Sequence, residues 1–289
     1  MGEMCLKNII VQNGSLKPIK RSKLRLVAGK TYYTLSRYML WYSGKLKFAH
    51  KNSSHHLEHI NFSHKTPLLR NLKEVDMQYQ YNKIINLKLA VNKLNDIVIK
   101  PGEMFSYWKL IGRPTEKKGY VPGMILHCGT YTMGVGGGLC QLSNFIYWMT
   151  LHTQLTVVER YRHSYDVFPD SNRIQPFGSG ATCVYPYRDL MIRNDTSDDF
   201  QLQVRVGESY LEGCWLSSSR PKYRYEIIEK NHQFKSEYWG GFSRHNELYR
   251  LIYSNDGILL DEEYITENHA LMMYAPFLSS RTDESEILR

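Results

Sequence analysis

The feature that most constrains the fold is a run of glycines just before a cysteine. Four glycines precede Cys140: Gly134, Gly136, Gly137 and Gly138. Because glycine has no Cβ, such a run permits positive φ and lets another backbone or a ligand come close. Apolar residues then recur at three- and four-residue spacing: Leu139, Leu142, Phe145, Ile146 and Met149. The pattern predicts a tight turn that delivers Cys140 into the first turn of an amphipathic helix.

Cys140 is the candidate nucleophile. Unpaired N–H groups and the positive end of the helix dipole gather at a helix N-terminus, which favours a thiolate over a thiol. His163 ends an alternating run that starts at Thr156, and it is the candidate base. Asp166 lies three residues further on and is the first candidate to orient the imidazole; Asp170 and Asn172 remain alternatives.

Neighbouring residues could contact a substrate. The backbone of Gly137 and Gly138, or the side chain of Gln141, could stabilise an oxyanion. Ser164 and Tyr165 share the polar run with His163 and are further candidate substrate contacts. The competing interpretation is structural, since a free cysteine is often a small buried apolar residue and a histidine is more often structural than catalytic.

Cysteine and histidine spacing gives no support for a metal or a disulfide framework. The five cysteines are widely spaced and form no CxxC or CxxH pair. The histidines at 55, 56 and 59 lack a carboxylate-rich partner stretch, which favours a surface run. No cofactor or metal is therefore expected. His127, beside Cys128, is an alternative base for Cys140.

Charge is uneven along the chain. Of the 37 Lys and Arg residues that give a net charge of +9, 18 lie in residues 1–100 against 5 Asp and Glu. A basic segment can meet an anionic membrane surface, or it can be a solvated face. No nucleic-acid-binding signature accompanies it, so no nucleic acid is expected. Tyr32, Leu35, Tyr38 and Met39 are predicted to share one face of a helix within Thr31–Trp41.

No signal peptide or long apolar run can be recognised in the sequence. Residues 1–13 lack a basic start and an apolar core, and no stretch approaches the ~18 apolar residues of a membrane span. The expectation is a cytoplasmic protein, with membrane association left open.

The chain divides into three parts that differ in composition and residue pattern. Residues 1–80 are basic and partly helical, residues 81–216 form a core domain, and residues 217–289 form a β-rich C-terminal extension. The core contains a predicted helix at 82–95, a strand at 97–99, and strands at 190–193 and 200–206 that are predicted to form a hairpin. The fold class is α+β, with the cysteine-bearing helix packed on an antiparallel sheet.

Several motifs together resemble the VanW family. They are the Lys-Pro-Gly-Glu-Met-Phe run at 100–105, the Gly-Gly-Gly-Leu-Cys-Gln run at 136–141, the Glu-Arg-Tyr-Arg-His-Ser-Tyr-Asp run at 159–166 and the Phe-Gly-Ser-Gly-Ala-Thr run at 177–182. The resemblance covers roughly residues 80–215, and it is the combination that is specific.

The resemblance implies a role around the bacterial cell wall. VanW proteins accompany gene clusters of B-type glycopeptide (vancomycin) resistance, and some exported proteins with this domain resemble L,D-transpeptidases that use a cysteine acyl-enzyme. By this resemblance Cys140 would be the nucleophile and His163 the base, acting on peptidoglycan or precursor stem peptides. The alternative is a non-catalytic accessory protein that recognises a cell-wall peptide or a partner enzyme. The oligomeric state is open.

Overall fold

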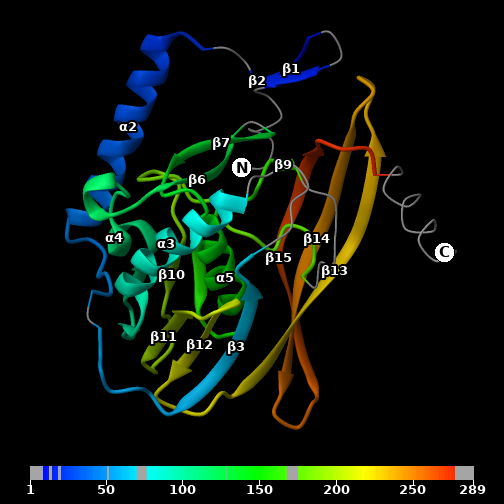
Figure 1. Cartoon of the computed structure of the whole chain (residues 1–289). Coiled ribbons are helices and arrows are strands. Elements are labelled where there is room, and N and C mark those ends of the chain that lie inside the picture. Colours follow the sequence, from blue (N-terminus) through cyan, green and yellow to red (C-terminus); the bar gives the residue numbers. More distant parts are fainter. Residues whose placement is uncertain are drawn as a thin grey trace, which may run out of the picture.

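The computed structural model describes residues 9–12, 15–18, 21–50, 52–69, 77–127, 129–167 and 175–276. It confirms the α+β class: helices and antiparallel sheets alternate irregularly along the chain (Figure 1). The helices are α2 (Lys23–Tyr42), α3 (Met77–Leu94), α4 (Tyr107–Ile111) and α5 (Cys140–Leu151), with a 3-10 turn, η1, at Glu116–Lys118. The strands of the first two-thirds are β1 (Ile9–Gln12), β2 (Ser15–Pro18), β3 (His59–Pro67), β4 (Ile97–Ile99), β5 (Met104–Ser106), β6 (Pro122–His127), β7 (Thr130–Val135), β8 (Thr156–Glu159) and β9 (Tyr165–Asp166). The remaining strands are β10 (Met191–Arg193), β11 (Phe200–Val206), β12 (Tyr210–Ser217), β13 (Tyr223–Ser236), β14 (Phe242–Ser254) and β15 (Leu259–Met272).

The cysteine-bearing helix α5 packs on a four-stranded antiparallel sheet of order β3-β12-β11-β4. The ring of His152, just after α5, stacks on Phe62 of β3 with ring centroids 3.9 Å apart. Trp215 of β12 is fully buried, and its indole N–H donates to Thr150 Oγ1 at 3.1 Å. Helix α3 also packs on this sheet, against β11. The core therefore lies between this sheet and the two helices.

The predicted hairpin of residues 190–206 is wrong. Strand β10 pairs with β5 and β8 in a three-stranded sheet, whereas β11 pairs with β12 and β4 in the other sheet. Asn194, at the point of separation, is fully buried and donates its side-chain N–H groups to Ile99 O and Asp198 O. These hydrogen bonds fix the loop so that its two flanking strands enter different sheets.

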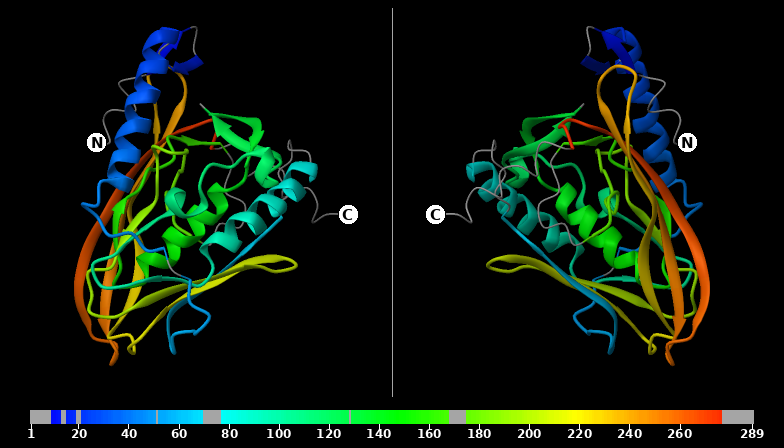
Figure 2. Two further views of the ribbon diagram at one scale, coloured as in Figure 1. Left: turned by 90° about the vertical axis from the view of Figure 1, so that its left-hand side faces the viewer. Right: turned by 90° about the vertical axis from the view of Figure 1, so that its right-hand side faces the viewer.

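The C-terminal extension is rich in β-structure: β13, β14 and β15 form a meander, and residues 255–257 form the turn between β14 and β15. The extension does not continue the core sheet. Instead β15 pairs in parallel with β9, so that Leu271 and Met272 lie opposite Tyr165 and Asp166. Figure 2 shows the three strands curving along one side of the body.

The N-terminal segment contributes one projecting helix and one core strand. Helix α2 begins at Lys23, earlier than the sequence pattern indicates, and its first half projects from the core at the end of the molecule where β1 and β2 also lie (Figures 1 and 2). Strand β3, which the sequence analysis did not anticipate, forms an edge of the core sheet. Within the described ranges, no helix combines the length and hydropathy needed to cross a membrane.

Candidate functional site

The glycine run is required by close backbone approach. A Cβ on Gly137 would lie 2.1 Å from the carbonyl carbon of Gly123 in β6, and one on Gly138 would lie 2.2 Å from Lys83 Cγ in α3. Gly138 also has φ +89°, in the left-handed region. The glycine run, which follows β7, therefore packs closely against β6 and against α3. Helix α5 starts directly after the run.

The amides of this turn are already engaged. Gly137 N–H donates to Gly134 O at 3.0 Å, and Gly138 N–H donates to Met124 O at 2.9 Å. Neither amide is free to donate to a substrate oxyanion in this conformation, so these two glycines serve as scaffold. By contrast, the N–H groups of Leu139 and Cys140 have no backbone acceptor within the part of the chain that the structure describes.

Cys140 is the first residue of α5, as predicted, but burial opposes the ionisation of its thiol. The residue is partly exposed, while its sulfur is surrounded by protein atoms, and this burial raises the pKa of the thiol. The N–H groups of Cys183 and of Cys140 itself point at the sulfur and act in the opposite direction, but burial outweighs them. The expectation that the helix N-terminus alone would lower the pKa is therefore wrong, and a thiolate requires a base.

His163 and Cys140 both contact the segment of residues 180–183. Thr182 Oγ1 lies 2.9 Å from His163 Nδ1, and a Cβ on Gly180 would lie 3.3 Å from His163 Cδ2. At the other end of the segment, the Cys183 N–H faces the Cys140 sulfur. The structure thus brings the predicted nucleophile and base to the same four-residue segment.

Polar side chains from the first turn of α5 hold this segment in place. Ser143 Oγ donates to Ala181 O at 2.7 Å, and Ala181 N–H donates to Asn144 Oδ1 at 2.7 Å. Gln141 is a predicted oxyanion donor. Its Nε2 donates a hydrogen bond to Pro67 O at 2.8 Å, and this bond connects α5 to the end of β3.

Arg160 is a positioning residue that the sequence analysis missed. Its guanidinium donates to Gly180 O from Nε at 2.8 Å and to Gly178 O from Nη2, and it lies 5.0 Å from the Tyr147 ring centroid. Burial lowers its pKa, yet an arginine stays charged at any physiological pH. The Glu-Arg-Tyr-Arg-His run contained it, but only the fold reveals which carbonyls it binds.

The residues after His163 run beside the C-terminal extension. Asp166 is buried, and it accepts hydrogen bonds from Arg244 Nη1 at 3.4 Å and Tyr274 Oη at 2.9 Å. Ser164 O accepts the Leu271 N–H, and Tyr165 is paired with Leu271. These partners join β9 to the extension. Asp170, Asn172, Cys128 and the side chain of His127 lie outside the described residues.

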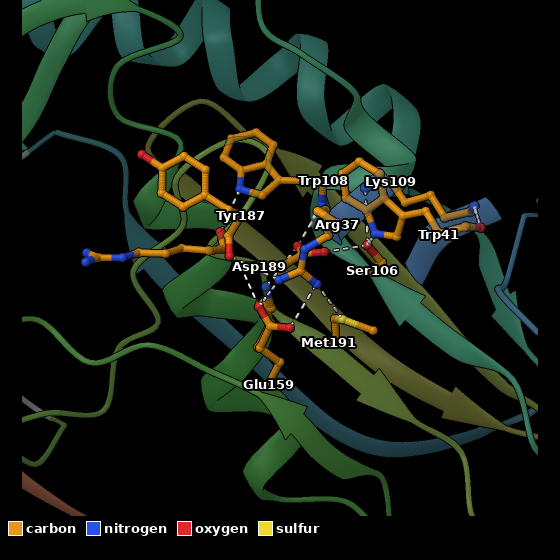
Figure 3. A network of polar contacts seen from close by, with 11 residues as sticks. Arg37, Trp41, Ser106, Trp108, Lys109, Glu159, Tyr187, Asp189 and Met191 are labelled. Atoms are coloured by element: carbon orange, nitrogen blue, oxygen red, sulfur yellow. Dashed lines mark hydrogen bonds and ion pairs between the residues drawn. The ribbon is translucent and has the colours of Figure 1, made fainter. Parts of the chain in front are cut away.

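A second polar network lies between α2 and the β5-β10-β8 sheet (Figure 3). Asp189 is fully buried and accepts hydrogen bonds from Ser106 Oγ, Trp108 N–H and Leu190 N–H. Arg37 of α2 forms a bidentate ion pair with Glu159. Burial raises the pKa of Asp189 to about 7, although the hydrogen bonds from Ser106 and Trp108 oppose the shift.

This network predicts a pH-dependent stability. Between the ordinary carboxyl pKa of about 4 and the folded value of about 7, the folded protein keeps a proton on Asp189 that the unfolded chain releases. Stability from this group is therefore present at acidic pH and is lost as the pH rises to 7. We expect Asp189→Asn to remove a slope of up to about 1.4 kcal/mol per pH unit from denaturant unfolding measured between pH 5 and 7.

The matched control is Asp195→Asn, because Asp195 is exposed and its hydrogen bond with Arg193 lowers its pKa. That variant should keep the wild-type slope between pH 5 and 7. An unchanged slope in Asp189→Asn would contradict the assignment.

Among the described residues, no group of three or more His, Cys, Asp or Glu side chains could hold a metal ion. The groove of 740 Å³ on the outer face of the core sheet is lined by residues of β3, β11 and β12, and none of Cys140, His163 or Asp166 borders it. The fold and the site define an α+β protein with a candidate cysteine–histidine site at the N-terminus of a helix that covers an antiparallel sheet.

Comparison with known proteins identifies the family. The profile of the family described as VanW like protein matches residues 82–216. The vancomycin B-type resistance protein VanW of Enterococcus faecalis is 34% identical over 200 residues, which cover 69% of this chain and 72% of that protein. The chain belongs to the VanW family. The uncharacterized protein YoaR of Bacillus subtilis is also 34% identical over 120 residues, 42% of this chain and 38% of that one. No solved structure matches.

Proposed function

We propose that this protein takes part in glycopeptide resistance as a cysteine acyl-transfer enzyme that acts on peptidoglycan or on its precursor stem peptides. The relative from Enterococcus faecalis, named for vancomycin resistance, supports the biological setting. The observation that supports the chemistry is that Cys140 and His163 both contact the segment of residues 180–183, with two N–H groups facing the Cys140 sulfur.

In the proposed reaction His163 takes the thiol proton and the Cys140 sulfur bonds to a peptide carbonyl carbon. The proposal assigns the oxyanion to the Leu139 N–H, because the amides of Gly137 and Gly138 donate to backbone carbonyls and that of Cys140 points at its own sulfur. Collapse of the adduct breaks the C–N bond, and His163 returns the proton to the leaving amine. A second amine, or water, then attacks the thioester and restores the thiol.

The raised thiol pKa makes His163 necessary to this reaction. Burial alone predicts a Cys140 alkylation midpoint above the ordinary thiol value of about 8.5. A cysteine–histidine ion pair instead predicts a midpoint below that value. The rate of iodoacetamide labelling across pH, with the adduct mapped by mass spectrometry, decides between them.

We expect a midpoint below about 8.5 in the wild type and above it in His163→Ala. His56→Ala, which removes an exposed histidine, should leave the midpoint unchanged. A wild-type midpoint above the ordinary value, with no response to His163→Ala, would refute the proposed role of His163.

The second candidate is a non-catalytic binding protein of the resistance system. The raised pKa of the Cys140 thiol and the engaged amides of Gly137 and Gly138 favour it. It predicts that a synthetic stem peptide binds equally well to Cys140→Ala and to the wild type in calorimetry, and that mass spectrometry detects no product.

A further inference from the structure

Helix α2 carries an apolar face that the fold leaves uncovered. Five large side chains follow one another at spacings of three, four or eight residues along the helix, and each is 61–81% exposed: Leu24, Tyr32, Leu35, Met39 and Tyr42. Such spacing places them on one broad stripe. Three of them, Tyr32, Leu35 and Met39, are predicted from the sequence to share one face of the helix, and that face points to solvent. Apolar patches of this kind mark sites for a partner or a membrane.

The opposite face of α2 already serves the fold. Arg37 and Trp41 are its buried residues, and they bind Glu159 and Ser106 respectively. The first half of the helix, which projects from the core, exposes further apolar side chains there: Leu26, Val27 and Tyr33. The body therefore anchors α2 by its second half and presents its apolar stripe outward.

The charged residues around this stripe are all basic. Arg21, Lys23, Arg25 and Lys30 lie at or near the projecting half, and the sequence contains no Asp or Glu between residues 4 and 57. A second copy of the chain would bring like charges together across an α2–α2 contact, which is unfavourable. An anionic lipid surface satisfies both the basic and the apolar side chains.

A second exposed aromatic group lies at the same end of the molecule. The β13–β14 turn reaches the end toward which α2 projects, in both directions of view (Figures 1 and 2). Tyr238 in this turn is 90% exposed. Tyrosine suits the interface between lipid and water, because its ring is apolar and its hydroxyl is polar.

We propose that α2 docks on an anionic phospholipid surface, lying in the plane of the interface with its apolar stripe in the lipid and its basic residues among the head groups. The β13–β14 turn provides a second contact. This docking is independent of the chemistry at Cys140, so each proposal can fail without the other.

Flotation of the full chain with vesicles tests it. Vesicles of phosphatidylcholine alone are compared with vesicles that contain phosphatidylcholine and phosphatidylglycerol in equal parts. We expect binding to the anionic vesicles, weakened by salt. Leu35→Glu should lower the partition coefficient by at least about tenfold, because it removes the apolar surface that this leucine would bury in the lipid. Lys30→Gln should lower it by about fivefold, the effect of one basic residue near such a surface.

The matched control is Ile258→Glu. Ile258 is 63% exposed, close to the 61% of Leu35, and it lies in the β14–β15 turn at the opposite end of the molecule. This variant should bind as the wild type does, and circular dichroism should show all three variants folded. If Leu35→Glu fails to fold, Lys30→Gln alone carries the test.

Three results would overturn the proposal. They are equal binding to neutral and anionic vesicles, loss of binding in Ile258→Glu as large as in Leu35→Glu, and absence of binding to either vesicle. If vesicle binding is absent and sedimentation shows self-association that Leu35→Glu removes, the stripe is an interface between two copies of the chain.

Discussion

Replacing Cys140 with serine is expected to lower acyl transfer by at least about a thousandfold, as loss of a catalytic nucleophile does elsewhere. A serine hydroxyl is far less acidic than a thiol, and no thioester can form. The measurement is the rate of product formation from a synthetic stem peptide and an acceptor amine, with intact-mass detection of the acyl-enzyme. In the wild type, quenched samples should contain an adduct that maps to Cys140.

Cys214→Ser is the matched control for this substitution. Cys214 is a partly buried cysteine in β12, and its sulfur contacts Gln203 at 3.7 Å. Its replacement should leave the rate within about twofold of the wild type, as for a mild substitution away from a reacting group. If Cys140→Ser and wild type form product equally fast, Cys140 is not the nucleophile, and the binding function becomes the better account.

Gly137→Ala is expected to destabilise the fold by about 3 kcal/mol, the upper range for a forced overpacking. The added methyl would lie 2.1 Å from Gly123 C and 2.2 Å from Gly123 O, and both are backbone atoms that cannot rotate away. The free energy of unfolding from denaturant titration measures the loss. The β6–β7 hairpin would have to move, and the start of α5 with it.

The control is the same substitution at an open position. A Cβ on Gly29 in α2 meets nothing within 4 Å. Gly29→Ala should therefore stabilise the protein by up to about 1 kcal/mol through helix propensity. If Gly137→Ala is as stable as the wild type, the two glycine backbones do not approach each other as described.

The predictions that succeeded rest on local signals. The glycine turn, the helix that starts at Cys140 and the strand Ile97–Ile99 are each specified by a few consecutive residues. Backbone conformation at such positions depends on side-chain size and spacing. It can therefore be predicted without knowing which distant residues pack against it.

The predictions that failed depend on partners distant in sequence. Strand β11 is flanked by turn residues that favour a hairpin with β10, yet its partners are β12 and β4. Burial affects the pKa of the Cys140 thiol more than the position at the helix N-terminus does. One residue beside the thiol is Cys183, and the sequence alone does not show that these two cysteines are neighbours. The role of Asp189 was not predictable from the sequence, because its hydrogen-bond partner Ser106 lies 83 residues away.

The parallel pairing of β9 with β15 has a consequence for how the protein is made. Leu271 and Met273 donate their N–H groups to Ser164 O and Asp166 O, on the segment that begins with His163. These donors lie in β15 and directly after it, more than a hundred residues after the acceptors. On the ribosome, the chain around His163 therefore lacks these backbone partners until the residues up to Met273 have been synthesised. Contacts of such high sequence separation form late and slowly. The nascent chain thus carries Cys140 well before the surroundings of His163 are complete, so Cys140 is synthesised before the candidate site can assemble.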